Sequence, residues 1–112
     1  MRACQPLHIA IRSAFVLALM SAGPALAQSP AVQRGQVFVR TNCAQCHAVD
    51  HYSPSPLKDA PPFRTLHRKY PVESLEEALA EGIVTGHPSM PEFRLDPGQI
   101  NDVIVYLKSL ER

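Results

Sequence analysis

The chain has 112 residues and a formal net charge of +1 at neutral pH, with 46% hydrophobic residues and no tryptophan. It contains no basic block, which excludes the electrostatic footprint of a nucleic-acid-binding protein. A chain of this length forms one small domain. Such domains often depend on a disulfide, a metal or another inserted group for stability.

The first 27 residues have the pattern of a secretory signal peptide. Arg2 and Arg12 supply positive charge, an apolar run covers residues 14–20, and small residues precede a cleavage position. The run is too short to span a bilayer, which needs about 20 apolar residues, and the cleavage pattern argues against an uncleaved membrane anchor. We therefore expect cleavage after Ala27, export to the periplasm and one mature domain, residues 28–112, without stable membrane insertion.

Removal of the signal peptide changes the chemistry of what remains. Nine basic residues then face ten acidic ones, so the formal charge becomes −1. Cys43 and Cys46 are the only cysteines of the mature chain, and Met90 is its only methionine. A net charge this close to zero predicts weak long-range steering of charged partners.

The first predicted helix covers residues 30–42 and leads directly into Cys43. Ser29 is a suitable N-cap, and Pro30 is a suitable first helical residue. Apolar positions and one glycine follow at spacings of three and four, which is the helical period. These residues are Val32, Gly35, Phe38 and Val39.

Residues 49–63 are predicted to be irregular, because four prolines forbid a continuous helix or a central strand. Residues 64–70 can form a short helix. Residues 83–93 are predicted to be a second loop, since glycine and prolines break them.

Two more helices are predicted. One begins after Pro71 and ends at Gly82, and the last begins at Pro97 after an Asp96 cap. Their inward-facing residues are Leu75 and Leu79 in the first, and Ile100, Val103, Ile104 and Leu107 in the second. No hairpin turn or alternating strand pattern stands out, so an all-α fold is predicted.

Residues 42–49 read NCAQCHAV and place Cys43, Cys46 and His47 in a C-x-x-C-H pattern. A thioredoxin-like dithiol is one interpretation, but its reactive thiol begins a helix within an α/β sheet, and here a helix precedes the pair. A structural zinc site is another, but it needs four ligands and no second tight ligand pair follows. Haem attachment needs two thiols for two vinyl groups and an adjacent histidine for the iron. The pattern therefore favours covalent haem.

The ligand on the opposite face of the iron decides the chemistry of such a site. An open position suits gas binding or peroxide activation, whereas a thioether closes the site and raises the reduction potential. Met90 lies in a turn-rich loop, and we expect it to be the sixth ligand. His67 and His87 are the rival ligands, because imidazole also binds haem iron. His51 is only four residues from His47, so we expect it on the same side as His47.

The segments GQVF, CAQCH, APPF, HPSMPEF and VIVYLKSL follow one another along the mature chain. In this order they resemble the class I cytochromes c, particularly small periplasmic bacterial members, over nearly the whole mature chain. The resemblance implies a cytochrome c-like fold, in which the N- and C-terminal helices cross beside one covalently bound haem. It also implies that Gly35 and Phe38 pack near Val103 and Tyr106.

The resemblance further implies that a proline carbonyl accepts a hydrogen bond from the His47 ring. Pro61 is the matching position, with Pro62 as the adjacent alternative. Mitochondrial members dock acidic partners through lysines around the haem edge. This chain has only three lysines after the signal peptide, so that mode of docking is not carried over.

These observations predict a monomeric periplasmic carrier of single electrons between a redox protein donor and acceptor. Cys43 and Cys46 would hold one haem c, and His47 and Met90 would ligate a low-spin iron. No general base, nucleophile or open metal position is evident, so no enzymatic activity of its own is expected. The alternatives are a dedicated haem subunit or electron acceptor of one oxidoreductase complex, and a five-coordinate haem protein that binds gas or peroxide.

Overall fold

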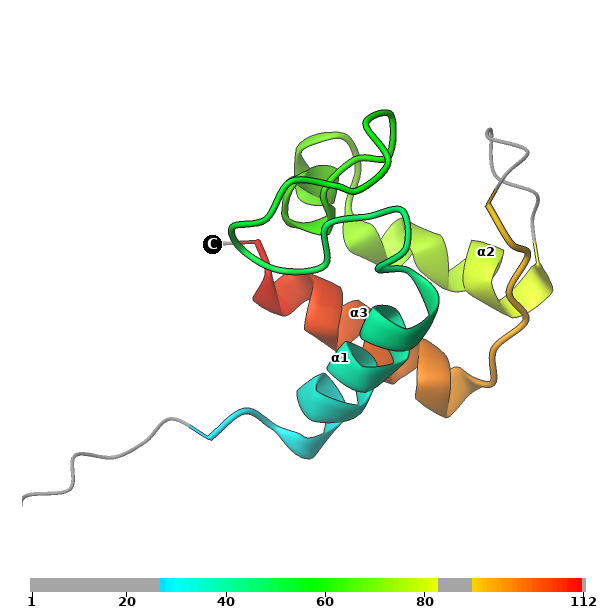
Figure 1. The fold of residues 1–112 in the computed structure, drawn as a ribbon. Helices are drawn as coiled ribbons and strands as arrows, with labels where there is room; N and C mark the ends of the chain where they lie inside the picture. The colour runs from blue at the N-terminus through cyan, green and yellow to red at the C-terminus, as the bar shows by residue number, and fades with distance from the viewer. Residues whose placement is uncertain (1–26, 83–89, 112) are drawn as a thin grey trace, which may run out of the picture.

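The computed structural model describes residues 27–82 and 90–111. Within these ranges the ordered elements are helical and no strand occurs, so the predicted all-α fold is confirmed. The α-helices are α1 (Pro30–Asn42), α2 (Leu75–Glu81) and α3 (Pro97–Ser109), and the short 3-10 helices are η1 (Phe63–Arg68) and η2 (Val72–Ser74). Figure 1 shows α1 and α3 crossing below a long irregular segment, with α2 to one side.

Helix α1 begins where its sequence predicts. The hydroxyl oxygen of Ser29 accepts a hydrogen bond from the Val32 N–H at 3.3 Å, and Pro30 occupies the first turn. Cys43 ends the helix, and its N–H donates to the Val39 carbonyl at 2.9 Å. The C-x-x-C-H pattern of residues 43–47, the cysteine motif, therefore starts at the last turn of α1.

Helix α3 is fixed at its start by a capping box. The Asp96 carboxylate accepts from the Gln99 N–H at 2.9 Å, and the Gln99 side chain accepts from the Asp96 N–H at 3.2 Å. Such reciprocal caps satisfy backbone donors that a helix start leaves unpaired. The buried residues of α3 are Ile100, Asp102, Val103, Ile104, Tyr106 and Leu107.

The crossing of α1 and α3 depends on Gly35. A Cβ atom at this position would lie against the backbone carbonyl of Asp102 and 2.8 Å from Tyr106 Cβ, so only glycine lets the two helices come this close. Arg34 then spans the crossing with two hydrogen bonds to the Asp102 carboxylate, at 2.6 and 2.9 Å. Arg34 also lowers the pKa of Asp102 through these bonds. The helix crossing implied by the resemblance is present.

The segment between Pro71 and Gly82 is less regular than predicted. It begins as the 3-10 helix η2 and becomes α-helical only at Leu75. Gly82 ends α2 in the left-handed conformation, with φ 75° and ψ 41°, as its glycine predicts. The short helix expected over 64–70 is the 3-10 helix η1, which begins one residue earlier.

A buried hydrogen bond ties the irregular segment to the helices. The Tyr106 hydroxyl on α3 donates to the Val49 carbonyl at 2.6 Å. The apolar core around this bond includes Val39, Leu66, Val72, Leu107 and Leu110. Val49 lies two residues after His47. The hydrogen bond to Val49 and the core around it therefore also fix the position of the cysteine motif.

No helix among the described residues is long and apolar enough to cross a membrane. The predicted signal peptide falls, except for Ala27, on residues 1–26, outside the described residues. His87 also lies outside them. The predicted cleavage after Ala27 and the export that it implies stay predictions.

Candidate functional site

The cysteine motif is wound into a tight turn at the end of α1. The N–H groups of Cys46 and His47 both donate to the Cys43 carbonyl, at 3.1 and 3.0 Å. Both cysteines are unpaired and half-buried, whereas His47 is only 8% exposed. The turn therefore presents two thiols and one imidazole within five residues.

The His47 ring is held in one orientation. Its Nδ1 lies 2.8 Å from the Pro61 carbonyl oxygen, so a protonated Nδ1 donates to Pro61 and the ring lone pair is on Nε2. The ring also packs on Phe63, with centroids 4.6 Å apart. The proline in hydrogen-bond contact is thus Pro61 rather than the adjacent Pro62.

Two adjoining hollows open beside this motif, with volumes of about 350 and 430 Å³. Each falls in the size range of cofactor pockets, about 300–1,000 Å³. The larger one is walled by apolar residues of α1, α2 and α3. The residues that line both hollows are Cys43, His47, Asp59, Phe63, Met90, Pro91 and Phe93.

The structure brings Met90 to the same place as the cysteine motif. Met90 is half-buried and lines both hollows together with His47. Two contacts hold the segment that follows Met90. The Leu95 N–H donates to the Leu79 carbonyl of α2 at 2.8 Å. The Phe93 ring packs edge-on against the Phe38 ring, with ring centroids 6.0 Å apart. The Met90 thioether and the His47 imidazole therefore line the same two hollows, which we together call the cavity.

The other histidines are placed differently. His67 and His51 are not among the described residues that line the two hollows. His67 Nδ1 is buried, and none of the described groups forms a hydrogen bond with it. This placement disfavours His67 as a ligand in the same cavity.

The electrostatics of Cys43 disfavour a redox dithiol. Burial raises the pKa of the Cys43 thiol to about 11, whereas a reactive thiol needs a lowered pKa. Cys43 also stands at the C-terminal end of α1, where the helix dipole disfavours a thiolate. Within residues 27–82 and 90–111, no group of three or more His, Cys, Asp or Glu side chains is placed so that it could hold a metal ion.

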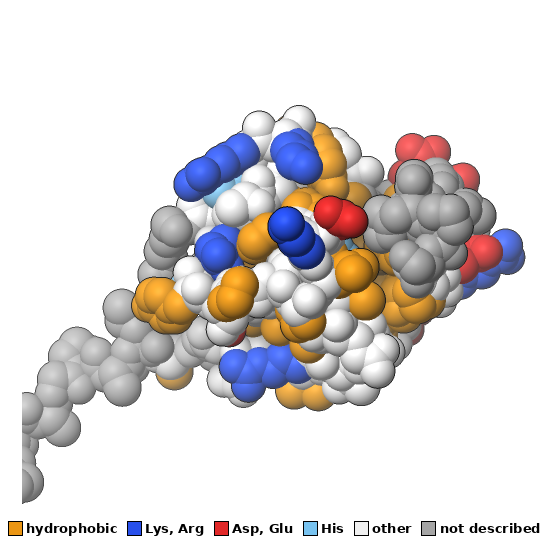
Figure 2. Space-filling view, turned by 45° about the horizontal axis from the view of Figure 1, so that its top comes forward, with side chains coloured by type: hydrophobic (Ala, Val, Ile, Leu, Met, Phe, Trp, Pro, Cys, Tyr) orange, Lys and Arg blue, Asp and Glu red, His pale blue; other side chains and the backbone are white. Residues whose placement is uncertain are grey.

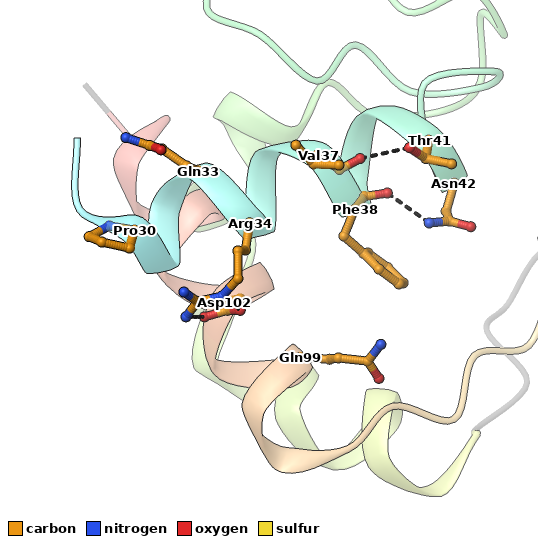
Figure 3. A pocket seen from close by; sticks show the side chains of 9 residues that line it. All are labelled: Pro30, Gln33, Arg34, Val37, Phe38, Thr41, Asn42, Gln99 and Asp102. Atoms are coloured by element: carbon orange, nitrogen blue, oxygen red, sulfur yellow. Dashed lines mark hydrogen bonds and ion pairs between the residues drawn. The ribbon is translucent and has the colours of Figure 1, made fainter. Parts of the chain in front are cut away.

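A larger hollow of about 690 Å³ lies on the outer side of the α1–α3 crossing (Figure 3). Its polar groups bond one another or the helix. Arg34 pairs with Asp102, and the Thr41 hydroxyl and Asn42 amide donate to carbonyls of α1 at 2.9 and 2.8 Å. No cysteine, methionine or histidine is among its described lining residues.

Sequence reasoning missed two aromatic residues of the site, Phe63 and Phe93. Phe63 comes directly after Pro62 in APPF, and Phe93 comes two residues after Pro91 in MPEF. An aromatic residue close to a presumed ligand or its hydrogen-bond acceptor is the signal that could have found them. The residues present fit a flat apolar cofactor that is joined to two thiols and enclosed by a histidine and a methionine.

Comparisons with known proteins agree with this geometry. The sequence profile of the family described as Cytochrome c matches residues 32–111. The chain is 26% identical over 104 residues to cytochrome c-552 of Bradyrhizobium diazoefficiens, an alignment that covers 93% of this chain and 98% of that protein. No solved structure matches the chain significantly.

Proposed function

Because the chain belongs to the cytochrome c family, we propose that it carries single electrons between redox proteins of the periplasm through a His47- and Met90-ligated iron. Its cofactor is haem c, and the spacing of Cys43, Cys46 and His47 is the one that covalent haem c requires. The observation that supports the ligand pair is the cavity that His47 and Met90 line together.

Each residue has a separate role in this proposal. The Cys43 and Cys46 thiols would hold the haem through two thioether bonds. The Pro61 carbonyl orients His47 and increases the basicity of its ring. Met90 favours the ferrous state and so raises the reduction potential.

The apolar walls of the cavity favour electron transfer over bond making. Haem iron supplies a one-electron redox couple. The phenylalanine and leucine side chains around the cavity would shield the haem from water, and iron ligation by His47 and Met90 would leave no position for a substrate. We therefore propose a carrier without catalytic activity of its own, in keeping with the typical role of its family.

A spectrum of the purified protein tests the proposal. Haem should stay with the chain in acidic acetone, and the mass should equal that of the mature chain plus one haem. The oxidised protein should show a low-spin spectrum with a sulfur-to-iron charge-transfer band in the near infrared. A colourless protein would overturn the haem assignment, and a high-spin spectrum would indicate an open iron that binds gas or peroxide.

A further inference from the structure

Helix α1 contributes an aromatic ring to the cavity in addition to the cysteine motif at its end. Phe38 lies five residues before Cys43 and lines the larger hollow of the cavity. It also lines the outer hollow at the α1–α3 crossing, where its ring points from α1 toward the start of α3 (Figure 3). The Phe38 ring is therefore part of the wall between the outer hollow and the cavity.

The Phe38 side chain has a firm base on α1. Gly35, almost one turn earlier, lies at the close crossing with α3, and the neighbouring Val39 is 0% exposed. The Phe38 side chain itself packs against the apolar core. A ring on such a base can support a segment of the chain that has little regular structure of its own.

The segment that carries Met90 needs such support. Between described residues, no backbone hydrogen bond involves residues 90–94, and the first one along the segment is that of the Leu95 N–H. Phe93 is half-buried, and its ring plane makes an angle of 70° with the Phe38 ring. Edge-to-face pairs of this kind stabilise a contact beyond the effect of the buried area.

A second side-chain contact of this segment is weaker. Arg94 donates to Glu92 at 3.2 Å, and both side chains lie against Gly82 at the end of α2. The Arg94 side chain is 74% exposed and the Glu92 side chain 44% exposed, and exposed ion pairs contribute little to stability. The contact between Phe38 and Phe93 is therefore the stronger of the two.

We propose that Phe38 is a positioning residue for Met90. Through its contact with Phe93 it holds the Met90 thioether at the cavity, so that the helix leading into His47 positions both iron ligands. This inference rests on the proposed function, because it needs Met90 as a ligand. Phe38 has no ligand atom and acts only through Phe93.

Displacement of Met90 by imidazole measures how firmly the thioether is held. The apparent association constant of imidazole for the oxidised holoprotein scales with the fraction of molecules in which Met90 has left the iron. Leu57 lines the smaller hollow and is 45% exposed, and Figure 2 shows hydrophobic side chains among charged ones at the surface. A small neutral probe can therefore reach the cavity.

Phe38→Ala should raise the apparent association constant of imidazole by a factor on the order of 10. The reduction potential should fall, because a loosely held thioether stabilises the ferrous state less. Phe38→Leu keeps most of the apolar volume without the aromatic contact, and it should give a smaller increase. An unchanged association constant in Phe38→Leu would overturn the proposal even if Phe38→Ala failed to fold.

A double-variant cycle tests whether Phe38 acts through Phe93. Phe93→Leu should raise the association constant of imidazole as Phe38→Leu does. Because each substitution removes the same contact, F38L/F93L should raise it hardly more than the larger single effect. Two effects that multiply in F38L/F93L would show that the two rings act independently, which would overturn the proposed coupling.

Val72→Ala is the control for a loss of overall stability. Val72 is 0% exposed and is not among the described residues that line the cavity. Val72→Ala should lower the melting temperature while the association constant of imidazole stays within about a factor of 2. An increase equal to that of Phe38→Ala would show that Phe38 acts through overall stability, and would overturn its positioning role.

The spectrum of the native protein separates this inference from the proposed function. A native protein without the sulfur-to-iron band would overturn Met90 ligation itself. If the native protein showed that band and the Phe38 variants bound imidazole no more tightly, the positioning role of Phe38 alone would be overturned.

Discussion

At the scale of single residues, Met90 gives the sharpest prediction. It is the only methionine after residue 27, so no other thioether can replace it. Met90→Ala should retain the haem, because the cysteine motif is untouched, while the reduction potential falls and the near-infrared sulfur band disappears. The reduced variant should also bind carbon monoxide, which absorption spectra would show.

His87→Ala is the matched control for Met90→Ala. It should keep the sulfur band and the reduction potential of the native protein. If His87→Ala removed a ligand from the iron and Met90→Ala did not, the iron of the native protein would have two histidine ligands.

Asp50 gives a prediction of pH dependence. Its carboxylate accepts hydrogen bonds from the Ser53 hydroxyl and N–H, both at 2.6 Å, and from the Tyr52 N–H at 2.8 Å. These bonds lower the pKa of Asp50 to about 2, below the value of about 3.9 expected in the unfolded chain. The ionised group therefore stabilises the fold above about pH 4, and this contribution is lost as the pH falls towards about 2.

Asp50→Ala should accordingly lower the melting temperature near neutral pH, and the difference from the native protein should shrink between about pH 4 and about pH 2. Asp59→Ala, on the same segment, is the control for loss of a nearby carboxylate. A difference that stayed constant over this pH range would show that the Asp50 hydrogen bonds do not stabilise the fold.

At the scale of elements, the α1–α3 crossing depends on the missing side chain of Gly35. Gly35→Val should destabilise the protein by about 1–3 kcal/mol or more, because the new side chain would overlap the backbone of Asp102. Helix propensity alone predicts a small gain of under about 1 kcal/mol. The free energy of unfolding of the holoprotein, measured with denaturant, distinguishes the loss expected from the overlap from the gain expected from helix propensity.

Gly98→Ala on α3 is the matched control for Gly35→Val. Gly98 is exposed, and its Cβ would meet only Asp96 Oδ1, at 3.2 Å. We expect a change of under about 1 kcal/mol in either direction. An equal loss of stability in both variants would place the cost of Gly35→Val in the helix itself rather than in the crossing.

Helix starts, which depend on neighbouring residues, could be predicted from the sequence by local chemistry. Contacts between residues that are distant in the sequence could not be predicted in this way. The caps at Ser29 and Asp96 marked both helix starts because a cap depends on neighbouring residues only. Pro61 was identified through the family resemblance and not through local chemistry, because its contact with His47 spans fourteen residues.

At the scale of the whole molecule, the cavity links stability to the cofactor. Many of its lining residues belong to the apolar core or pack against it, among them Leu66, Leu75, Leu79 and Leu107. Without haem these side chains would face a void or water. We therefore expect the C43A/C46A variant, purified without haem, to lose cooperative thermal unfolding and part of its helical circular dichroism.

The single variant Cys46→Ala is the control for C43A/C46A, because one thioether can still hold the haem. It should melt cooperatively at a lower temperature than the native protein. If C43A/C46A unfolded cooperatively at the melting temperature of the native protein, the polypeptide core would be sufficient to stabilise the fold without haem.

The position of the cysteine motif at the end of α1 has a consequence for the order of assembly. The two thiols and His47 are contiguous in sequence, so haem capture needs no tertiary structure. Met90 approaches only when the segment before α3 is held against α2 and α3 has crossed α1. We therefore expect the chain to take up its cofactor while still extended, and the remaining helices to fold around the bound haem.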